Sequence, residues 1–415
     1  MKLNYKRTML IGLAFMSIMA FSQMYDNIIP LILKNSFNLG ETLIGSIMAI
    51  DNILALFLLP IFGAISDKID TPIGKRMPFI LVGTTIVSIL IFLLPIADNN
   101  RNLPLFIISL FFILIFMGIY RSPAVALMPD LTPKPLRSRG NAVINLMGTL
   151  GGIYCLLMIK FLVPKGDTPN YFNLFISISV FMILSIIILF FTIKEKKIHK
   201  AMIDNNEIIE DEEKTNSKGK KTKTKLSREI KSSLIFMLLS IALWFIGYNA
   251  VTTAFSRYAT EVWDMQNGTY ADCLMIATII AVLSYIPIAK LSAKIGRKKT
   301  ILVGIVMLMI CYSGVSFYSI YHTSLVFFFA LIGIGWAAIN VNSLPMVVDM
   351  CSFSDVGKYT GYYYTFSMSA QIITPILSGF LMENISYKTL FPYAFISTML
   401  AFLTMLKVKH GDVKN

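Results

Sequence analysis

Twelve long apolar runs constrain the fold of this sequence more than any other feature. A helix needs about 20 consecutive apolar residues to cross a hydrocarbon core of about 30 Å, and these runs reach or approach that length. Only 14% of the residues are charged, whereas soluble domains carry about 25%. We therefore expect an all-α membrane protein with twelve transmembrane helices. The runs lie at 8–33, 43–65, 79–97, 104–128, 141–163, 172–193, 233–256, 271–289, 299–320, 323–347, 360–382 and 389–406.

Most of the 37 Lys and Arg residues fall on one side of the membrane when the spans are drawn with both termini on that side. By the positive-inside rule, both termini are expected in the cytoplasm of a multi-pass plasma-membrane protein. The first run is too long for a cleavable signal peptide and lacks a small-residue cleavage site. The net charge of +14 is then a consequence of membrane orientation, so the expected partner is the lipid bilayer and not nucleic acid.

One long polar connection separates six spans from six. It contains an acidic run followed by "KTNSKGKKTKTK", a composition that stays solvated and can touch anionic lipid through its lysines. We expect an N-terminal six-helix bundle over 1–193, a flexible cytoplasmic linker over 194–231 and a C-terminal six-helix bundle over 232–415. No metal site or cofactor is predicted, because the cysteines lack metal spacing and are typical of small buried hydrophobic residues: Cys155, Cys273, Cys311 and Cys351.

The two halves of the sequence repeat each other weakly, as the halves of duplicated transporters do. In the first span, "YDN" is followed eight residues after Asp26 by Lys34; in the seventh span, "YNA" is followed eight residues after Asn249 by Arg257. This register favours Arg257 as an interfacial anchor. It also marks Asp26 as a feature of the first half alone, because its counterpart Asn249 is neutral.

The connection between the second and third spans, "GAISDKIDTPIGKRMPFILVG" at 63–83, carries clustered charges. Its glycine at position 63 permits close helix approach, and its acidic and basic side chains can hold the cytoplasmic side shut. A shorter segment of similar sequence, "AKLSAKIGRKKTILVG", lies at 289–304 between spans 8 and 9. The predicted cytoplasmic gate comprises Gly63, Asp67, Gly74, Lys75, Arg76, Arg137, Arg139 and Asp349.

This connection resembles the loop signature of the major facilitator superfamily, in the longer "SD…GKRxPF" variant of the glycoside-pentoside-hexuronide and sucrose transporter-like branch. The segment "YRSPAVALMPDLTPKPLRSRGNA" at 120–142 resembles that branch's fourth span and following loop. The resemblance implies two pseudo-symmetric six-helix bundles, a central cavity lined mainly by spans 1, 4, 7 and 10, and cation-coupled sugar transport.

Departures from the branch's pattern bear on the coupling ion. Sodium-coupled melibiose-type relatives carry acidic residues in span 2 where this chain has Ala55 and Leu59, and an Asp in span 4 where it has Arg121. We therefore expect a proton as the coupling ion, with sodium the less favoured choice. We call the charged side chains of the 63–83 connection, which can hold the cytoplasmic side shut, the latch. In the second half, Ala293 stands where the first half has the latch aspartate Asp67, which argues against an equivalent latch in that half.

Charged residues inside spans are costly and usually mark substrate or ion paths. Asp26 and Asp51 share a depth of about 10–12 Å below the outer rim, at about 1.5 Å per residue. If they share a cavity, like-charge repulsion would hold one of them protonated; alternatively, Asp51 packs away from the cavity. Arg121 could pair with a carboxylate, bind an anionic substrate or act in a gate, and pairing is favoured because an unpaired buried Arg costs most. Asp130 either couples to protons, as the resemblance implies, or joins Asp67 in the latch.

Sugar recognition needs flat apolar faces and a few fixed polar partners. Spans 1 and 7 place Tyr beside Asp or Asn at matched positions, although Trp and Tyr on membrane helices are more often belt or packing residues. The predicted substrate-binding residues are Gln23, Tyr25, Asn27, Trp244, Tyr248, Asn249, Trp336, Asn340, Asn342, Tyr364 and Gln371, and the predicted coupling residues are Asp26, Asp51, Arg121 and Asp130.

These features predict a secondary active transporter, functional as a monomer, that takes up a glycoside or disaccharide with a proton by alternating access. The alternatives are a drug or metabolite exporter of the same superfamily and a sodium-coupled sugar symporter. The sequence lacks G-x-x-x-x-G-K-[ST], which argues against an ATP-driven pump. It also lacks H-E-x-x-H and G-x-S-x-G, which argues against an enzyme.

Overall fold

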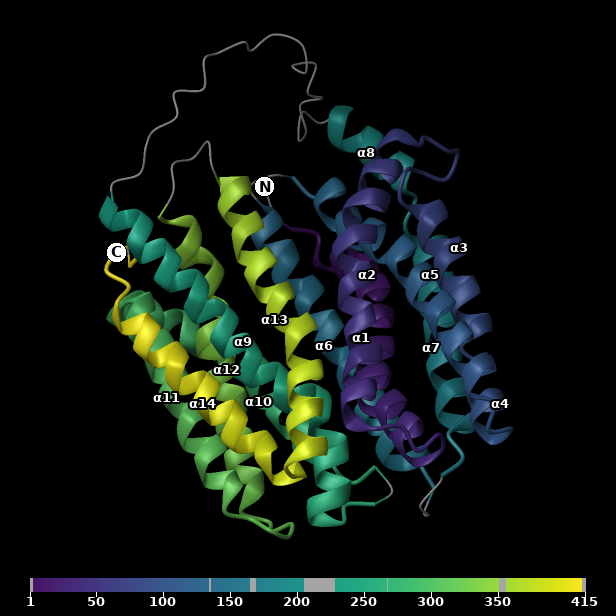
Figure 1. The fold of residues 1–415 in the computed structure, drawn as a ribbon. Coiled ribbons are helices and arrows are strands. Elements are labelled where there is room, and N and C mark those ends of the chain that lie inside the picture. The colour runs from purple at the N-terminus through teal and green to yellow at the C-terminus, as the bar shows by residue number, and fades with distance from the viewer. Residues whose placement is uncertain are drawn as a thin grey trace. The chain divides into compact units, whose positions relative to one another are not determined.

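The computed structural model describes residues 3–133, 136–164, 169–204, 228–266, 268–350 and 356–412. The regular structure of these residues is helical apart from one antiparallel bridge between Thr71 and Gly74 (Figure 1). The helices are α1 (Tyr5–Asn35), α2 (Glu41–Lys68), α3 (Met77–Leu90), α4 (Leu93–Asn99), α5 (Leu103–Asp130), α6 (Arg137–Leu162), α7 (Phe172–Thr192), α8 (Glu195–Asp204), α9 (Arg228–Trp263), α10 (Ala271–Ile295), α11 (Arg297–Ser316), α12 (Leu325–Val348), α13 (Val356–Asn384), the 3₁₀ helix η3 (Tyr387–Thr389) and α14 (Leu390–Leu406).

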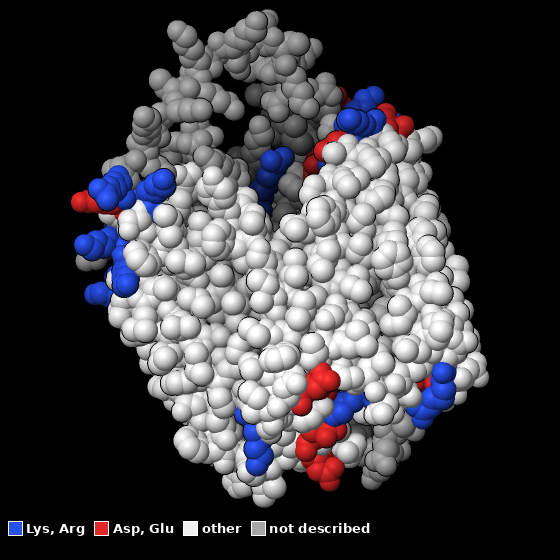
Figure 2. All heavy atoms as spheres, viewed as in Figure 1, with Lys and Arg blue, Asp and Glu red and all other residues white. Residues whose placement is uncertain are grey.

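Twelve helical segments of the described chain are long and apolar enough to cross a membrane. Each corresponds to one predicted span, and α3 and α4 together form the third. Charged side chains gather near the helix ends on the face shown in Figure 2, and the surface between those ends is uncharged. The prediction of an all-α membrane protein with twelve spans is confirmed.

The chain forms two compact units, which share helices α1 and α2. The first unit comprises Met1–Gln23, Leu54–Met158 and Asn170–Lys225; the second comprises Met24–Ile53, Ile159–Pro169 and Leu226–Asn415. Residues 24–53, which include the end of α1 and the start of α2, thus pack with helices from the C-terminal half. The division into bundles at 1–193 and 232–415 stays a prediction, drawn from sequence order and not from packing.

Glycines set the closest helix contacts inside the first unit. A Cβ at Gly151 of α6 would lie 2.0 Å from the carbonyl oxygen of Met16 in α1, and a Cβ at Gly83 of α3 would lie 2.6 Å from Tyr120 Cβ in α5. Because glycine has no side chain, the helix backbones approach closely at these two positions. Close approach strengthens van der Waals packing, which matters in a membrane because apolar side chains gain little by leaving lipid for a helix contact.

In the second unit, α12 packs against α10 and α11, while α9 packs against α13 and α14. Small residues again permit the contact: a Cβ at Gly333 of α12 would lie 2.2 Å from the Ala277 carbonyl oxygen of α10. Within this arrangement α9 and α12 meet where Tyr248 stacks on Trp336.

Both ends of the predicted flexible linker are helical. Residues 195–204 form α8, and α9 begins at Arg228. The flexible cytoplasmic linker over 194–231 stays a prediction. Residues 205–227 lie outside the described residues. Among the cysteines, Cys155, Cys273 and Cys311 are buried, as predicted, and Cys351 lies outside the described residues.

Candidate functional site

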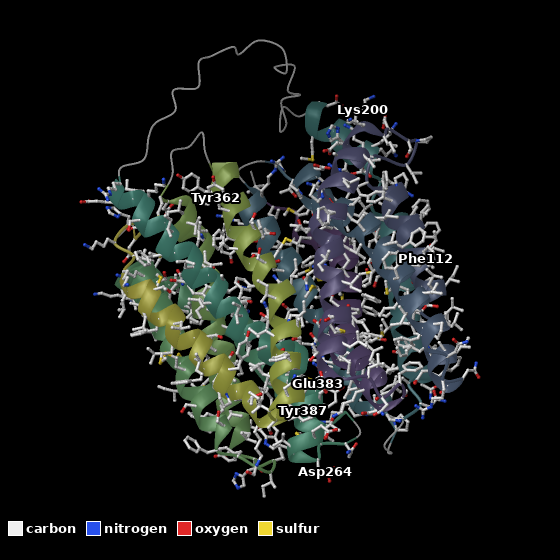
Figure 3. All side chains as sticks on the ribbon, in the orientation of Figure 1. Phe112, Lys200, Asp264, Tyr362, Glu383 and Tyr387 are labelled. Carbon is white, nitrogen blue, oxygen red and sulfur yellow. The ribbon has the colours of Figure 1, made fainter. Side chains whose placement is uncertain are left out.

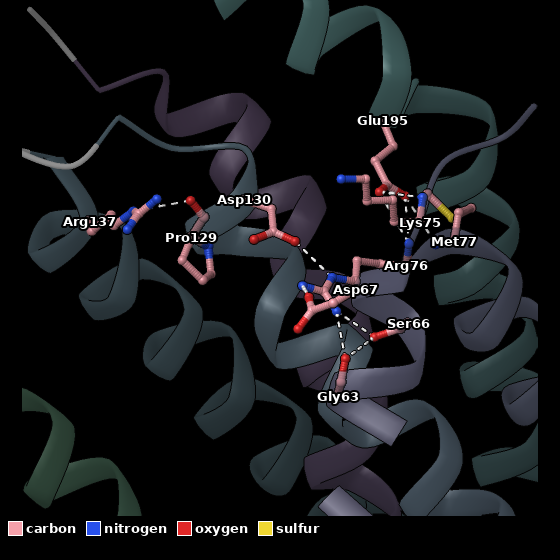
Figure 4. A network of polar contacts seen from close by, with 10 residues as sticks. All are labelled: Gly63, Ser66, Asp67, Lys75, Arg76, Met77, Pro129, Asp130, Arg137 and Glu195. Carbon is pink, nitrogen blue, oxygen red and sulfur yellow. Dashed lines mark hydrogen bonds and ion pairs between the residues drawn. The ribbon is translucent and has the colours of Figure 1, made fainter. Parts of the chain in front are cut away.

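Two of the predicted gate residues, Gly63 and Asp67, meet around the guanidinium of a third, Arg76 (Figure 4). Nε of Arg76 donates to Asp130 Oδ2 at 2.7 Å, and Nη2 donates to Asp67. Nη1 donates to the carbonyl oxygen of Gly63 at 3.3 Å and to the Ser66 hydroxyl. The Arg76 side chain is only 7% exposed, so its charge depends on these partners. We call these five residues the Arg76 cluster.

Local sequence explains how the Arg76 cluster assembles. Asp67 lies in the last turn of α2, Asp130 ends α5, and Arg76 directly precedes α3. Gly74 adopts a left-handed φ of 125° in the turn that reverses the chain, a conformation that glycine accepts at little cost. Burial alone would lower the pKa of Arg76, but the hydrogen bonds and charges of Asp130 and Asp67 outweigh burial and raise this pKa above its ordinary value.

Glu195, which sequence reasoning left in the linker, caps the start of α3. Its Oε1 accepts from the backbone N–H of Lys75 at 2.7 Å, and its Oε2 accepts from that of Met77 at 3.0 Å. The N–H of Arg76 donates to both oxygens at 3.1 Å. N-terminal N–H groups lack partners within the helix and carry the positive end of its dipole, so a carboxylate is the fitting acceptor. Glu195 therefore holds the turn that presents Arg76.

The second unit repeats this arrangement with one carboxylate fewer. Arg297 pairs with Asp349 at the end of α12, as Arg76 pairs with Asp130 at the end of α5. Asp412 Oδ1 accepts from the N–H groups of Arg297 at 2.7 Å and Lys298 at 3.3 Å at the start of α11. Ala293 supplies no carboxylate. The signal for both caps was available in the sequence as an acidic residue shortly after spans 6 and 12.

Not all predicted gate residues join these clusters. Arg137 Nε donates to the carbonyl oxygens of Pro129 at 3.1 Å and Thr132 at 3.3 Å, and the side chains of Arg139 and Lys75 are exposed. Of the two alternatives for Asp130, the geometry favours membership of the latch with Asp67.

Gly74→Ala is expected to destabilise the protein. A Cβ at this position would lie 2.1 Å from Glu195 Oε2, and the left-handed φ adds strain, so we expect the unfolding free energy to fall by about 1–3 kcal/mol. Thermal unfolding in detergent measures the change. Gly361→Ala is the matched control, because a Cβ there meets no described atom within 4 Å. Equal melting temperatures for the two variants would contradict the role assigned to Gly74.

Two of the predicted coupling carboxylates lie near one phenol in the second unit. The Tyr25 hydroxyl donates to the carbonyl oxygen of Met48 at 3.2 Å and so links α1 to α2. Both Asp51 and Asp26 interact electrostatically with the phenol, and both are half-buried. The structure thus places both Asp26 and Asp51 within electrostatic reach of the Tyr25 phenol. Their part in proton coupling stays a prediction.

Three other predicted residues lie on or beside α1. Asn27 is fully buried. Gln23 is half-buried opposite Gly152 of α6, whose Cβ would lie 3.7 Å from Gln23 Oε1. Arg121 is half-buried on α5 beside Tyr120, with which it interacts electrostatically; its predicted pairing with a carboxylate stays a prediction.

An aromatic surface forms between α9, α12 and α13 of the second unit. Tyr248 stacks on Trp336 with a centroid distance of 3.7 Å and an interplanar angle of 4°, and Phe245 meets the edge of Trp336 at 5.3 Å. Asn340, one turn after Trp336 on α12, is exposed although it lies within a membrane span, and Tyr364 of α13 is 52% exposed. Half-buried Asn249 and Gln371 lie on the same helices, α9 and α13.

Two predicted substrate residues of α9 and α12 are buried, as Tyr25 and Asn27 of α1 are. Asn342 is 3% exposed, accepts from Ser292 through Oδ1 and donates to the Ala338 carbonyl oxygen at 2.8 Å through Nδ2. The Trp244 ring is fully buried in α9. Both side chains therefore fall outside the surface that a substrate could reach in this structure.

The interpretation of Arg257 as an interfacial anchor is wrong. Its side chain is 1% exposed, and its Nε donates to Glu41 Oε2 at 2.7 Å, with Glu41 only 4% exposed. An anchor would hold its charge in water, whereas Arg257 is buried and paired with a carboxylate far away in the sequence.

Twelve helical segments of membrane-spanning length with charged clusters at their ends define a multi-pass membrane protein among the described residues. The sequence model described as the Major Facilitator Superfamily matches residues 11–335 and 268–415. The chain therefore belongs to the major facilitator superfamily. The fold and the family indicate a secondary transporter and not an enzyme.

The chain is also similar to individual members of the superfamily. An uncharacterized MFS-type transporter of Methanocaldococcus jannaschii is 26% identical over 391 residues, which cover 93% of this chain and 90% of that protein. The isoprimeverose transporter of Lactiplantibacillus pentosus is 20% identical over 284 residues, covering 66% of this chain and 56% of that protein. The inward open xylose transporter XylE from E. coli has a TM-score of 0.68 at 15% identity, covering 99% and 96% of the two chains, and this likeness shows the fold alone. The glycoside-pentoside-hexuronide branch stays a prediction.

Proposed function

We propose that this protein is a proton-coupled importer of a glycoside or disaccharide that works by alternating access. It resides in the plasma membrane as a monomer with both termini in the cytoplasm, and it uses protons and not sodium. The observation that carries the substrate class is the aromatic surface around Trp336 with the exposed amide of Asn340 beside it.

The chemistry of that surface suits a sugar ring. Stacked Tyr248 and Trp336 form a rigid apolar platform, and pyranose C–H groups pack against such aromatic faces. An amide offers both a donor and an acceptor to sugar hydroxyls, and Asn340 is exposed within a span, where polar groups are costly unless they serve a path. A relative named for isoprimeverose transport supports the same class.

The grouping of Asp26 and Asp51 around Tyr25 supports proton coupling. Two nearby carboxylates in partly buried surroundings disfavour double ionisation, so one proton can be held and released as the surroundings change. The residues that differ from sodium-coupled relatives, Ala55, Leu59 and Arg121, supply no carboxylate for sodium.

Asn340→Ala is expected to raise the sugar concentration for half-maximal transport about tenfold, because a hydrogen bond contributes roughly 1 kcal/mol and a desolvated partner costs more. Asn342→Ala is the matched control two residues away: it should lower thermal stability and leave that concentration within about twofold. The measurement is the concentration dependence of counterflow in liposomes. Equal effects of the two substitutions on half-saturation would contradict the assignment of Asn340 to the substrate path.

Counterflow in proteoliposomes tests the substrate class without assuming a coupling ion. Liposomes loaded with one compound and diluted into its labelled form would be compared for glucosides, galactosides, sucrose, maltose, dipeptides and lipophilic cations. We expect counterflow with a glycoside or disaccharide only. Exchange limited to lipophilic cations, with broad competition and tolerance of changes at Tyr25 and Asn249, would instead identify an exporter.

A further inference from the structure

Tyr285 of α10 adjoins two parts of the aromatic surface around Trp336, although it is not among the predicted substrate residues. Its phenol hydrogen-bonds to the side chain of Asn340 on α12. The same phenol interacts electrostatically with that of Tyr248 on α9, and the Tyr285 side chain is half-buried. One hydroxyl therefore connects the exposed amide of the surface to its stacked rings.

Helical spacing explains why Tyr285 faces α12. Ala281, Tyr285 and Ile288 follow one another at intervals of four and three residues, so they share one face of α10. Ala281 and Ile288 form a buried cluster with Ala337 and Ala338 of α12, and Tyr285 packs against this cluster. Ala337 and Ala338 lie within the segment of α12 that carries the aromatic surface. Packing thus fixes the Tyr285 ring beside that surface.

Hydrogen bonds on two sides hold the rotation of α12 about its axis. The Ser292 hydroxyl of α10 donates to Asn342 Oδ1. Toward α13, Ser343 Oγ lies 3.1 Å from the Tyr363 hydroxyl, and Tyr363 adjoins Tyr362, which Figure 3 labels near one end of α13. Because α12 is held by both neighbours, its exposed amide stays within reach of the phenol on α10.

The hydrogen bond to Tyr285 determines what the Asn340 amide can offer to a ligand. An asparagine side chain carries an acceptor oxygen on one edge and two N–H donors on the other. An exposed amide without a fixed partner can turn either edge outward. A phenol fixed by packing occupies one polar atom of the amide and selects one of the two orientations. A selected orientation gives specificity, because a ligand that mismatches it leaves a polar group without a partner.

We propose that Tyr285 is a positioning residue of the substrate site, whose hydroxyl orients the Asn340 amide toward the sugar. Its interaction with Tyr248 keeps that amide in register with the stacked rings. The inference rests on the proposed function, because it takes the surface around Trp336 as the place where the sugar binds. Tyr285 acts on the sugar through Asn340, so loss of its hydroxyl weakens binding only while Asn340 is present.

A double-mutant cycle of Tyr285 and Asn340 tests this dependence. Tyr285→Phe removes the hydroxyl and keeps the packed ring. We expect it to raise the half-saturating concentration for counterflow about fivefold, the effect of one ordinary hydrogen bond, with the maximal rate within about twofold of the unmodified protein. In Asn340→Ala protein, the same change should cause no further rise. Two residues that act independently would instead multiply their effects, to about fiftyfold.

Ser292→Ala is the matched control, because it removes a hydroxyl from the same face of α10 that bonds the buried Asn342. It should lower thermal stability and leave half-saturation within about twofold. An unchanged half-saturation in Tyr285→Phe, or a further fivefold rise in the double variant, would overturn the positioning role. The cycle uses the compound that gives counterflow. A compound other than a sugar would overturn the proposed substrate class, and the cycle read with that compound would still decide the role of Tyr285.

Discussion

Replacing Asp26 with asparagine should reduce sugar accumulation in energised vesicles from roughly 50-fold to about onefold. One charge that moves inward across 100 mV contributes about 2.3 kcal/mol, which corresponds to an accumulation ratio of roughly 50. Asparagine matches the size of aspartate but cannot carry a proton, so the gradient no longer drives the sugar. Counterflow needs no proton release, and it should continue. The measurement compares accumulation with counterflow in the same vesicle preparation.

Asp51→Asn is the matched control for this prediction, because both carboxylates interact with the Tyr25 phenol. We expect Asp51→Asn to weaken accumulation and leave it above onefold. Loss of accumulation in Asp51→Asn alone would move the proton to Asp51. Full accumulation in both variants would contradict proton coupling through this pair.

Arg76→Ala should lower the maximal transport rate by about 10- to 100-fold. Hydrogen bonds to charged groups are each worth about 1.5–3 kcal/mol, and the exposure of Asp67, at 61%, reduces the sum to the lower part of that range. Loss of Arg76 leaves Asp130 and Asp67 as like charges and weakens the state in which this end of the first unit is closed. Initial rates of counterflow at saturating substrate measure the effect.

Arg137→Ala provides the comparison for Arg76→Ala. Its guanidinium donates to two carbonyl oxygens near the end of α5, and its loss leaves no carboxylate without a partner. We therefore expect a smaller loss, of about tenfold or less, in the range of an ordinary hydrogen bond. If both arginine variants lose activity equally, the special position of Arg76 between two carboxylates is not what matters for transport.

The spans and the Arg76 cluster could be predicted because their signals are local. Apolar runs of the required length identify a spanning helix without knowledge of its neighbours. Gly63, Asp67 and Arg76 lie within one short connection, so the turn alone brings them together. Asp130 could be predicted as a candidate from the motif at 120–142. Only its contact with Arg76 in the structure favours a place in the latch over a role in proton coupling.

Contacts between distant segments could not be predicted from one sequence. Arg257 and its partner Glu41 are separated by 216 positions, and nothing near either residue indicates the other. Glu195 begins a charged run that is typical of a solvated linker, yet its carboxylate accepts hydrogen bonds from the backbone N–H groups at the start of α3. Asn340 and Asn342 are equivalent by composition, and only the rotation of α12 exposes one and buries the other.

Substrate-driven proton entry tests the central claim most directly. Proteoliposomes with a trapped pH indicator and no imposed gradient would receive the sugar that gives counterflow, first without sodium and then with it. The account predicts internal acidification that depends on the sugar, is the same with and without sodium, and is absent in Asp26→Asn. Sugar entry without any acidification, or entry only when sodium is present, would contradict it.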